Sequence, residues 1–234
     1  MPTKEELKQQ VCAQIDQQAD SISALGEDIM DHPELGFKEV RTAQRVAELF
    51  EEIGLPCEHG LAVTGVRAVL RGSKPGPTIA LMGELDALVV PDHPRADPAT
   101  GAAHACGHNA QIAGLTGAAL GLVGANAAEH LSGNVVFFAV PAEEYVEIDY
   151  RLGLVKEGKT SFIQGKPELV QLGYFDDVDM AVMIHSSSPD QVDGSMGIAA
   201  SNNGFLAKNI RFIGRAAHAG TRPELGVNAL NAAT

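Results

Sequence analysis

Apolar residues recur along the chain at spacings that distinguish helices from strands, and turn residues separate the runs. Near-helical spacing predicts one long helix that opens at a Thr3–Glu6 capping box and continues to about Met30. A second amphipathic helix is predicted over residues 38–53, with Gly54 as its C-terminal cap. The Ala- and Gly-rich stretch 109–124 predicts a tightly packed, buried helix.

Short apolar runs of strand length alternate with these helices. They cover residues 62–70, 78–82, 135–140 and 180–184, the last two being continuously apolar and therefore expected to be buried. A Pro- and Asp-rich loop is expected over 89–103, and 152–172 is expected to be helical in parts. Alternation of strands and helices predicts an α/β fold, with a mixed sheet flanked by helices.

The pattern changes after His185. Residues 194–200 and 206–214 read as strands, and 223–233 as a helix that the end of the chain interrupts. This order predicts the start of a smaller α+β domain. We place the boundary between 192 and 193, so that 1–192 form one domain and 193–234 begin the next.

Composition excludes some classes of function. Acidic residues number 30 against 17 basic ones, giving a formal charge of −13, which argues against a nucleic-acid-binding protein. The three cysteines are scattered, which favours a reducing cytoplasm over a disulfide framework. The polar N-terminus resembles no signal peptide, and no apolar run approaches the ~20 residues that span a bilayer.

The stretch from His104 to His108 places three metal-capable side chains within five positions, spaced by Ala and Gly. Imidazole and thiolate are ligands of a borderline divalent ion such as zinc, so Cys106 and His108 are candidate metal ligands. A nucleophilic Cys106 paired with a histidine is the competing interpretation. It needs a base and an oxyanion hole that the sequence does not identify.

Further candidates follow apolar strands directly. Glu84 and Asp86 end one run, Glu143 and Glu144 follow another, and His185 ends a third. In α/β sheets, ligands bind at the carboxyl ends of strands. Of two adjacent glutamates, one can bind metal while the other moves a proton. The alternatives are a solvated acidic loop, a helix N-terminus that favours acidic residues, and an ordinary histidine.

Together these motifs resemble the dinuclear metallo-amidohydrolase and exopeptidase family, of the aminoacylase–carboxypeptidase type. Within it they resemble the branch of hippurate, auxin-conjugate and aminobenzoyl-glutamate hydrolases. In order, the matching segments are His32-Pro33-Glu34-Leu35-Gly36, Leu85-Asp86-Ala87-Leu88, His104-Ala105-Cys106-Gly107-His108, Pro141-Ala142-Glu143-Glu144, His185, Gly214-Arg215-Ala216-Ala217-His218-Ala219-Gly220 and Pro223 to Leu230. The resemblance implies a zinc-exopeptidase-like catalytic domain with a lid and dimerisation domain.

The resemblance also implies residue roles. Cys106, His108, Glu144 and His185 would bind two divalent ions, zinc or manganese, with nickel or cobalt as other options. Glu143 would be the general base, Asp86 would orient a ligand, and His218 of the lid would stabilise the oxyanion in the partner subunit's site. Asn228 would contact substrate.

Three departures from the family pattern stand out: Asn109-Ala110-Gln111 replaces Asp-Gly-His, Val89-Val90 replaces a Pro-led turn, and 145–173 is longer than usual. The family's final His ligand, which follows the lid, is absent. We therefore expect a polypeptide of residues 1–234 to bind metal weakly, self-associate and show little activity.

The sequence thus predicts a cytoplasmic, metal-dependent hydrolase of small N-acyl amino acids or related amides, dimeric through its lid, without nucleic-acid or membrane partners. The alternatives are a Cys106-based acyl-transfer enzyme and a non-catalytic amide-binding relative.

Overall fold

The computed structural model describes residues 2–187, 195–198, 208 and 210–234. The chain divides into two compact units, Met1–Ser187 and Ser188–Thr234, and each is described by itself. The predicted boundary between 192 and 193 lies outside the described residues and stays a prediction.

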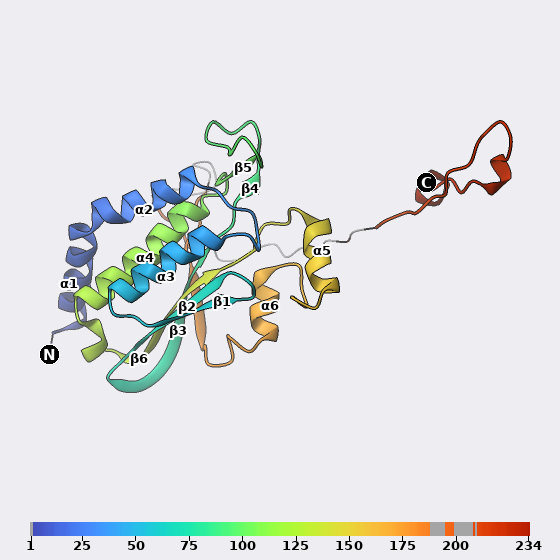
Figure 1. Ribbon diagram of the computed structural model, residues 1–234. Coiled ribbons are helices and arrows are strands. Elements are labelled where there is room, and N and C mark those ends of the chain that lie inside the picture. Colours follow the sequence, from blue (N-terminus) through green and yellow to red (C-terminus); the bar gives the residue numbers. More distant parts are fainter. Residues whose placement is uncertain (1, 188–194, 199–207, 209) are drawn as a thin grey trace. The chain divides into compact units, whose positions relative to one another are not determined.

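A five-stranded mixed sheet forms the centre of the first unit (Figure 1). Its order is β1 (Cys57–Leu61), β2 (Gly65–Arg71), β6 (Ser132–Val140), β3 (Lys74–Glu84) and β7 (Met180–Met183). β6, β3 and β7 run parallel, whereas β2 pairs with β1 and β6 in the antiparallel sense. The predicted α/β fold with a mixed sheet flanked by helices is confirmed.

Four helices pack over one face of the sheet: α1 (Lys4–Gln17), α2 (Ala19–Asp31), α3 (Val40–Glu52) and α4 (His108–Gly124). The larger core lies beneath them, where Val46 and Phe50 of α3 meet Phe137 of β6 and Ile112 of α4. The predicted helices over 38–53 and 109–124 are confirmed, and Gly54 takes the left-handed φ of +78° just after α3.

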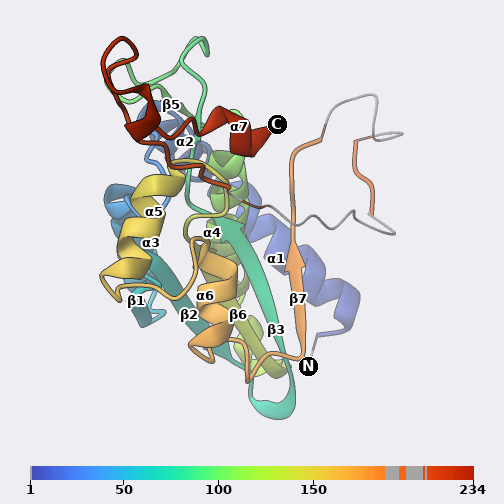
Figure 2. The ribbon, with the colours of Figure 1, turned by 90° about the vertical axis from the view of Figure 1, so that its right-hand side faces the viewer.

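A thinner layer covers the opposite face, with α6 (Gly165–Gln171) beside the sheet and α5 (Ile148–Lys156) beyond it (Figure 2). Leu169 of α6 packs in the second core with Val136, and the Phe175 ring stacks on Phe138 at 5.1 Å between centroids. Residues 152–172 are therefore helical in parts, as predicted.

The predicted single helix up to Met30 is wrong in one respect, because it breaks at Gln18. The Thr3–Glu6 capping box is present, but Gln18 leaves the helical path and its carbonyl accepts a hydrogen bond from the Ser21 hydroxyl at 2.9 Å. The break gives two helices that both pack on α4, whose glycines leave room for apolar side chains such as Ile15 at Gly121 and Ile22 at Gly117.

Two strand predictions need correction. The predicted strand 62–70 begins only at Gly65, because Ala62 and Val63 form a turn with positive φ that joins β2 to β1, a strand that the sequence did not predict. Residues 180–183 do form β7, but they are exposed rather than buried, since β7 lies at the sheet edge. The 89–103 loop is bounded by β4 (Leu88–Val89) and β5 (Ala102–Ala103).

Short elements complete the described parts of both units. A 3₁₀ turn, Ala127–Glu129, follows α4. In the second unit, the predicted helix 223–233 is wrong: a 3₁₀ turn at Pro223–Leu225 and helix α7 (Leu230–Ala233) are separated because Val227 pairs with Arg215 through two backbone hydrogen bonds. The predicted strand 194–200 lies largely outside the described residues, and 210–214 carry no strand assignment.

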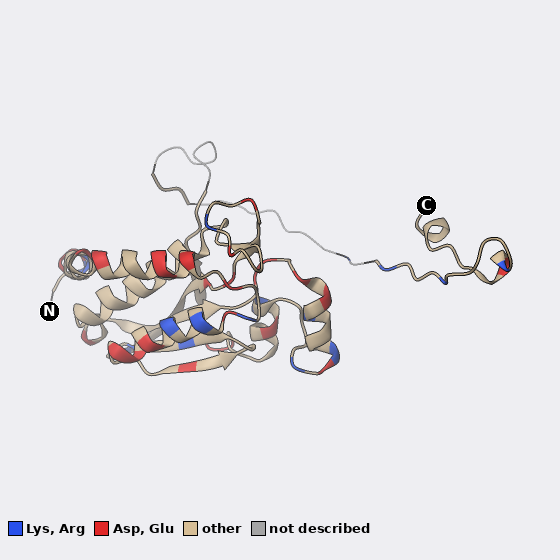
Figure 3. Ribbon diagram, turned by 45° about the horizontal axis from the view of Figure 1, so that its top comes forward, with Lys and Arg blue, Asp and Glu red and all other residues tan. Residues whose placement is uncertain are grey.

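Surface charge agrees with the acidic composition, since acidic positions recur along the outer helices with basic ones among them (Figure 3). All three cysteines are free thiols. Within the described ranges, no helix has the length and apolarity to cross a membrane.

Candidate metal centre

Three parallel strands end at the same edge of the sheet, and each is followed by a candidate residue. Glu84 is the last residue of β3 and lies in register with Val140, the last residue of β6. Glu143 and Glu144 follow β6, and His185 follows β7. Strand direction therefore brings together residues that lie up to 101 positions apart in sequence, counting from Glu84 to His185.

The entry to α4 supplies Cys106 and His108. Gly107 is the N-cap of α4 with φ of +86°, and a β-carbon there would overlap the Ser186 hydroxyl. That hydroxyl donates a hydrogen bond to the Cys106 carbonyl at 2.7 Å. Only glycine fits this position, because it must both adopt the left-handed conformation and let the segment after β7 approach.

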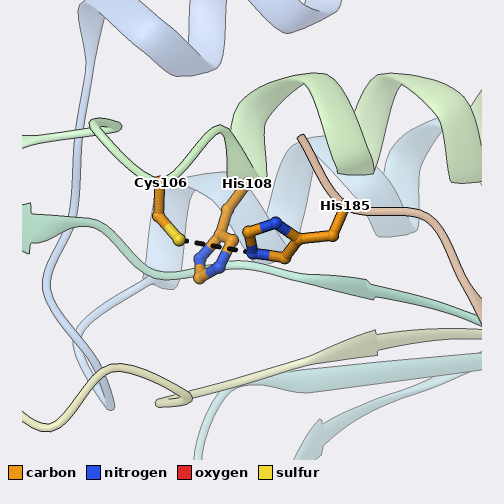
Figure 4. Close-up of side chains that lie close together, drawn as sticks. All are labelled: Cys106, His108 and His185. Atoms are coloured by element: carbon orange, nitrogen blue, oxygen red, sulfur yellow. Dashed lines mark hydrogen bonds between the residues drawn. The ribbon is translucent and has the colours of Figure 1, made fainter. Parts of the chain in front are cut away.

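Cys106, His108 and His185 converge (Figure 4). The Cys106 Sγ lies 3.3 Å from the His185 Nε2, and one ligand atom from each of the three residues lies within 4.8 Å of the others. The structure therefore brings these three predicted ligands together from the α4 entry and the end of β7.

His108 is oriented by Asp86. Its Nδ1 lies 2.7 Å from the Asp86 carbonyl oxygen, so the ring donates there and directs Nε2 toward two carboxylates. Nε2 lies 3.0 Å from Glu84 Oε2 and 3.8 Å from Glu144 Oε1. Burial alone would lower the pKa of His108, but the neighbouring Asp86 and Glu84 carboxylates outweigh it and raise the pKa to about 10.

Asp86 also fixes the glutamate pair. Its fully buried carboxylate accepts the backbone N–H of Glu143 at 3.0 Å and that of Glu144 at 2.9 Å. Two successive amides directed at one anion form a nest, which sets the backbone of both residues. The predicted orienting function of Asp86 thus has a geometric basis, through the main chain of the glutamates as well as through His108.

Glu143 lies in a second group of possible ligands with Glu84 and His108, again within 4.8 Å of one another. Burial, and then the charge of Glu84, raises the pKa of Glu143. Lys166 of α6 approaches both acids: its ammonium pairs with Glu84 Oε1 and lies 3.8 Å from Glu143 Oε1. Glu144 is placed between His108 and Cys106, close enough to raise the pKa of the thiol.

Sequence reasoning named Glu84 as a strand-end candidate but gave it no role, and it missed Lys166. Glu84 is 1% exposed, and its pKa falls to about 2 because, although burial opposes this, His108 and Lys166 stabilise the carboxylate. The signal for Glu84 was its strand-end position beside Asp86. Lys166 lies in the 145–173 stretch, whose mixed pattern gave no indication of its neighbours.

A cation fits the centre. Three buried atoms that converge there have no hydrogen-bond partner among the described residues: Glu84 Oε2, His108 Nε2 and Glu144 Oε1. Unpartnered buried polar atoms are costly, and a divalent ion would satisfy all three. The donors comprise thiol, imidazole and carboxylate groups, which together suit zinc and also admit manganese.

The Cys106 thiol is poorly suited to act as a free nucleophile. Burial, followed by the charges of Glu144, Glu143 and Glu84, raises its pKa to about 12. A nucleophilic cysteine needs a lowered pKa, whereas a metal ion would stabilise the thiolate directly. The electrostatics therefore favour ligation over attack on an acyl group.

A buried layer of polar and charged side chains packs around Asp86 and Ala142. Arg151 of α5 is fully buried, with Nη2 3.7 Å from Asp86 Oδ2. Glu39 accepts hydrogen bonds from the Thr64 hydroxyl at 2.6 Å and from the Ala142 amide at 2.7 Å. Arg151 balances the charge of Asp86. Glu39 anchors Ala142, the residue just before the two glutamates.

The His32-to-Gly36 motif is structural. Glu34 accepts hydrogen bonds from the Arg41 and Thr42 amides at the start of α3, and its carbonyl accepts the Ala87 amide at 2.8 Å. A β-carbon at Gly36 would overlap the Arg151 guanidinium. The motif thus joins α3 to the segment that carries Asp86.

Gln111 explains one departure from the family pattern. Its side chain accepts the Glu84 amide at 2.6 Å and donates to the Ile184 carbonyl at 2.6 Å, so it bridges the ends of β3 and β7. The departure at this position therefore supports the placement of both Glu84 and His185.

The second unit contains His218 and Asn228. The Gly220 amide donates to His218 Nδ1 at 3.1 Å, and Asn228 accepts the Leu230 amide at 3.0 Å at the start of α7. Because the two units are not placed relative to one another, the roles predicted for these two residues stay predictions.

An α/β sheet with carboxylate and imidazole donors at its strand ends, beside a thiol and a second imidazole at the entry to α4, defines a candidate metal-centre protein. The chain belongs to the peptidase family M20/M25/M40, which it matches over residues 80–233. The predicted family resemblance is confirmed.

Named relatives include hydrolases of two kinds. The chain is 35% identical to thermostable carboxypeptidase 1 of Saccharolobus solfataricus over 164 residues, covering 68% of this chain and 37% of that protein. It is 31% identical to an N-acyl-L-amino acid amidohydrolase of Geobacillus stearothermophilus, covering 97% of this chain and 56% of the relative. The matched region thus spans about a third to a half of these relatives.

A solved structure agrees with the fold. The Bacillus subtilis YXEP protein, described as a dinuclear metal-binding peptidase of the M20 family, superposes with a TM-score of 0.56 at 28% identity. The match covers 69% of this chain and 41% of that one.

Proposed function

We propose that this chain carries most of the metal centre of an amidohydrolase that cleaves small N-acyl amino acids. The main support is the convergence of Cys106, His108 and His185 beside the Glu143–Glu144 pair. Three buried donor atoms at this point have no hydrogen-bond partner among the described residues. The amidohydrolase and carboxypeptidase relatives support hydrolysis of an amide bond.

Cys106, His108, Glu144 and His185 would hold the ions. Two ions is the number given for the YXEP protein, and zinc or manganese suits this donor set. When bound, such an ion polarises a carbonyl and lowers the pKa of water. The candidate substrates differ in their acyl group, and aminobenzoyl-glutamate is one of them.

Glu143 would hold and move the proton. Its carboxylate lies on the side of the centre that Lys166 approaches, its pKa is raised by burial and by Glu84, and its backbone is fixed by Asp86. A carboxylate with a raised pKa can take a proton from the attacking water and return it to the leaving amine. Glu144, adjacent but directed at His108 and Cys106, would remain a ligand.

The predicted functions of His218 and Asn228 belong to the same proposal. His218 would stabilise the oxyanion of a partner subunit in a homodimer, and Asn228 would contact substrate. The free thiols accord with a reducing cytoplasm.

The test combines metal content with turnover. Protein purified without chelator is assayed on N-acetyl, N-benzoyl and aminobenzoyl amino acids, before and after metal removal and with zinc or manganese restored. We expect bound metal and, at the low rate expected for residues 1–234, amide cleavage that a chelator abolishes and metal restores.

Cys106→Ser should lose bound metal and activity together, whereas Cys57→Ser, at a half-buried thiol in β1, should lose neither. Turnover that survives complete metal removal would contradict the proposal and favour a Cys106 nucleophile. Metal binding without cleavage of any of these amides would favour an amide-binding relative instead.

A further inference from the structure

Glu84 is held at the centre more rigidly than a solvated acid would be. It is the last residue of β3 and is 1% exposed. The Gln111 side chain accepts its backbone N–H at 2.6 Å. The position of the Glu84 carboxylate is thus set by the sheet and by α4 rather than by solvent.

The two oxygens of Glu84 have different surroundings. Oε1 pairs with the Lys166 ammonium, whose side chain is one-third exposed. Oε2 is buried, has no hydrogen-bond partner among the described residues, and lies 3.0 Å from His108 Nε2, which is also buried and unpartnered. One oxygen therefore has a lysine as its partner, and the other faces the His108 ring.

The tautomer of His108 determines which groups can lie between its Nε2 atom and Glu84 Oε2. Because Nδ1–H donates to the Asp86 carbonyl, a neutral ring presents a lone pair at Nε2. That lone pair faces Glu84 Oε2 and, 3.8 Å away, Glu144 Oε1, which are acceptors as well. A proton on Nε2 would satisfy Glu84 Oε2 at 3.0 Å but would leave Glu144 Oε1 at 3.8 Å without a partner, whereas a metal ion would bind all three atoms.

The separations suit a metal ion. Ligand atoms bound tetrahedrally at about 2.0–2.2 Å lie roughly 3.4 Å apart, and the observed 3.0 and 3.8 Å fall on either side of that value. Glu143 brings a further carboxylate within 4.8 Å of Glu84 and His108.

We propose that Glu84 is an additional metal-binding residue of this centre, using Oε2, and that Lys166 neutralises its other oxygen. The proposal rests on the metal-centre function proposed above and extends the ligand set from four residues of the chain to five. It also gives the 145–173 stretch a function, because that stretch supplies the lysine that balances the added carboxylate.

The test is metal affinity, measured by calorimetric titration of the metal-free chain with Mn²⁺. Glu84→Gln keeps the size of the side chain but removes its charge. We expect affinity to fall by more than the roughly 10–100-fold typical of residues that only orient ligands. Glu168→Gln is the matched control, since Glu168 is another buried glutamate but binds the Ser161 and Phe162 amides.

Lys166→Met separates ligation from a purely structural ion pair. If Glu84 binds the ion, removing the neighbouring positive charge should leave Mn²⁺ affinity equal or higher. If Glu84 matters only through its pair with Lys166, Lys166→Met should weaken binding as much as Glu84→Gln does, and the proposal is overturned. Circular dichroism melts show whether each variant is folded at the titration temperature.

Failure of this inference can be told apart from failure of the proposed function. With Co²⁺, a thiolate-to-metal charge-transfer band should appear in wild type and in Glu84→Gln but not in Cys106→Ser. Wild-type Mn²⁺ affinity in Glu84→Gln, with the cobalt band and turnover intact, overturns only the Glu84 assignment. Absence of metal binding by wild type overturns both.

Discussion

Gly36 lies directly against the Arg151 guanidinium, with no room for a β-carbon between them. Arg151 is fully buried and sits behind Asp86, so the glycine of an N-terminal motif sets the position of a group that supports the metal centre. A motif that carries the family resemblance in sequence therefore acts through packing.

We expect Gly36→Ala to destabilise the protein by about 1–3 kcal/mol, the usual cost of overpacking a buried site. Urea denaturation monitored by circular dichroism measures the effect. Gly153→Ala is the control: it lies in α5 and its added β-carbon would meet nothing within 4 Å, so stability should stay equal or rise by up to ~1 kcal/mol. Equal effects of both variants would mean that Arg151 moves aside freely.

Glu143→Gln should lower turnover by about 10²–10⁴-fold and leave metal content unchanged, because a general base is lost but the ligands remain. Glu144→Gln should lower metal content as well. Metal analysis beside steady-state kinetics on one N-acyl amino acid checks both variants, and Glu147→Gln, whose carboxylate pairs with Lys38 instead, serves as control. The opposite pattern would show that the two glutamates exchange roles.

The buried Glu39 should make stability depend on pH. Burial, and then the charge of Asp86, raises the pKa of Glu39 from 4.5 to about 8. The folded state thus binds a proton that the unfolded state releases between about pH 4.5 and 8. The stability contributed by this group is complete below about pH 4.5 and is lost as the pH rises through 8, with a slope of at most about 1.4 kcal/mol per pH unit.

Glu39→Gln should remove that dependence. The difference in free energy of unfolding between variant and wild type should shift in favour of the variant as pH rises from 5 to 8.5, measured by urea denaturation at each pH. Glu48→Gln, on the outer surface of α3, should give a difference that changes little over the same range. A flat difference for Glu39→Gln would mean that Glu39 is ionised when folded.

The exposed edge strand should promote self-association. All four residues of β7 are exposed, and Val182 is 52% exposed on a strand that pairs with β3 alone among the described strands. Val182→Lys should reduce association, because edge lysines block strand pairing. Sedimentation velocity over a concentration series measures it, with Val170→Lys on α6 as control. Equal association of both variants would exclude β7 as the contact.

Helices and strands with a regular spacing of apolar residues could be predicted from the sequence, because that spacing shows which face of the element is buried. The apolar face of α3 at Val46 and Phe50 and the continuous run of β6 are examples. β1 could not, since Cys57 to Leu61 is a mostly exposed strand without alternation. The break at Gln18 carries no Gly or Pro, and packing on α4 decides it.

The candidate site was predictable where several residues end apolar strands, as Asp86, Glu143 and His185 do. Glu84 was a candidate without an assigned role, because an acid in a Gly-Glu-Leu-Asp run fits a solvated loop equally well. Its burial depends on Gln111 and Lys166, which approach from other elements. Such neighbours are set by tertiary structure, and a single sequence contains no local signal for them.

The hydrogen bonds from the Glu143 and Glu144 amides to Asp86 affect how variants of this protein should be interpreted. Arg151, Gly36 and Glu39 touch no ligand atom of the centre, yet each bears on Asp86 or on Ala142, the residue that precedes the glutamates. A change at any of them would tilt Glu143 and Glu144 together. In a screen scored by activity alone, these three positions would therefore look like catalytic residues, and only their effect on folding stability would reveal that they are not.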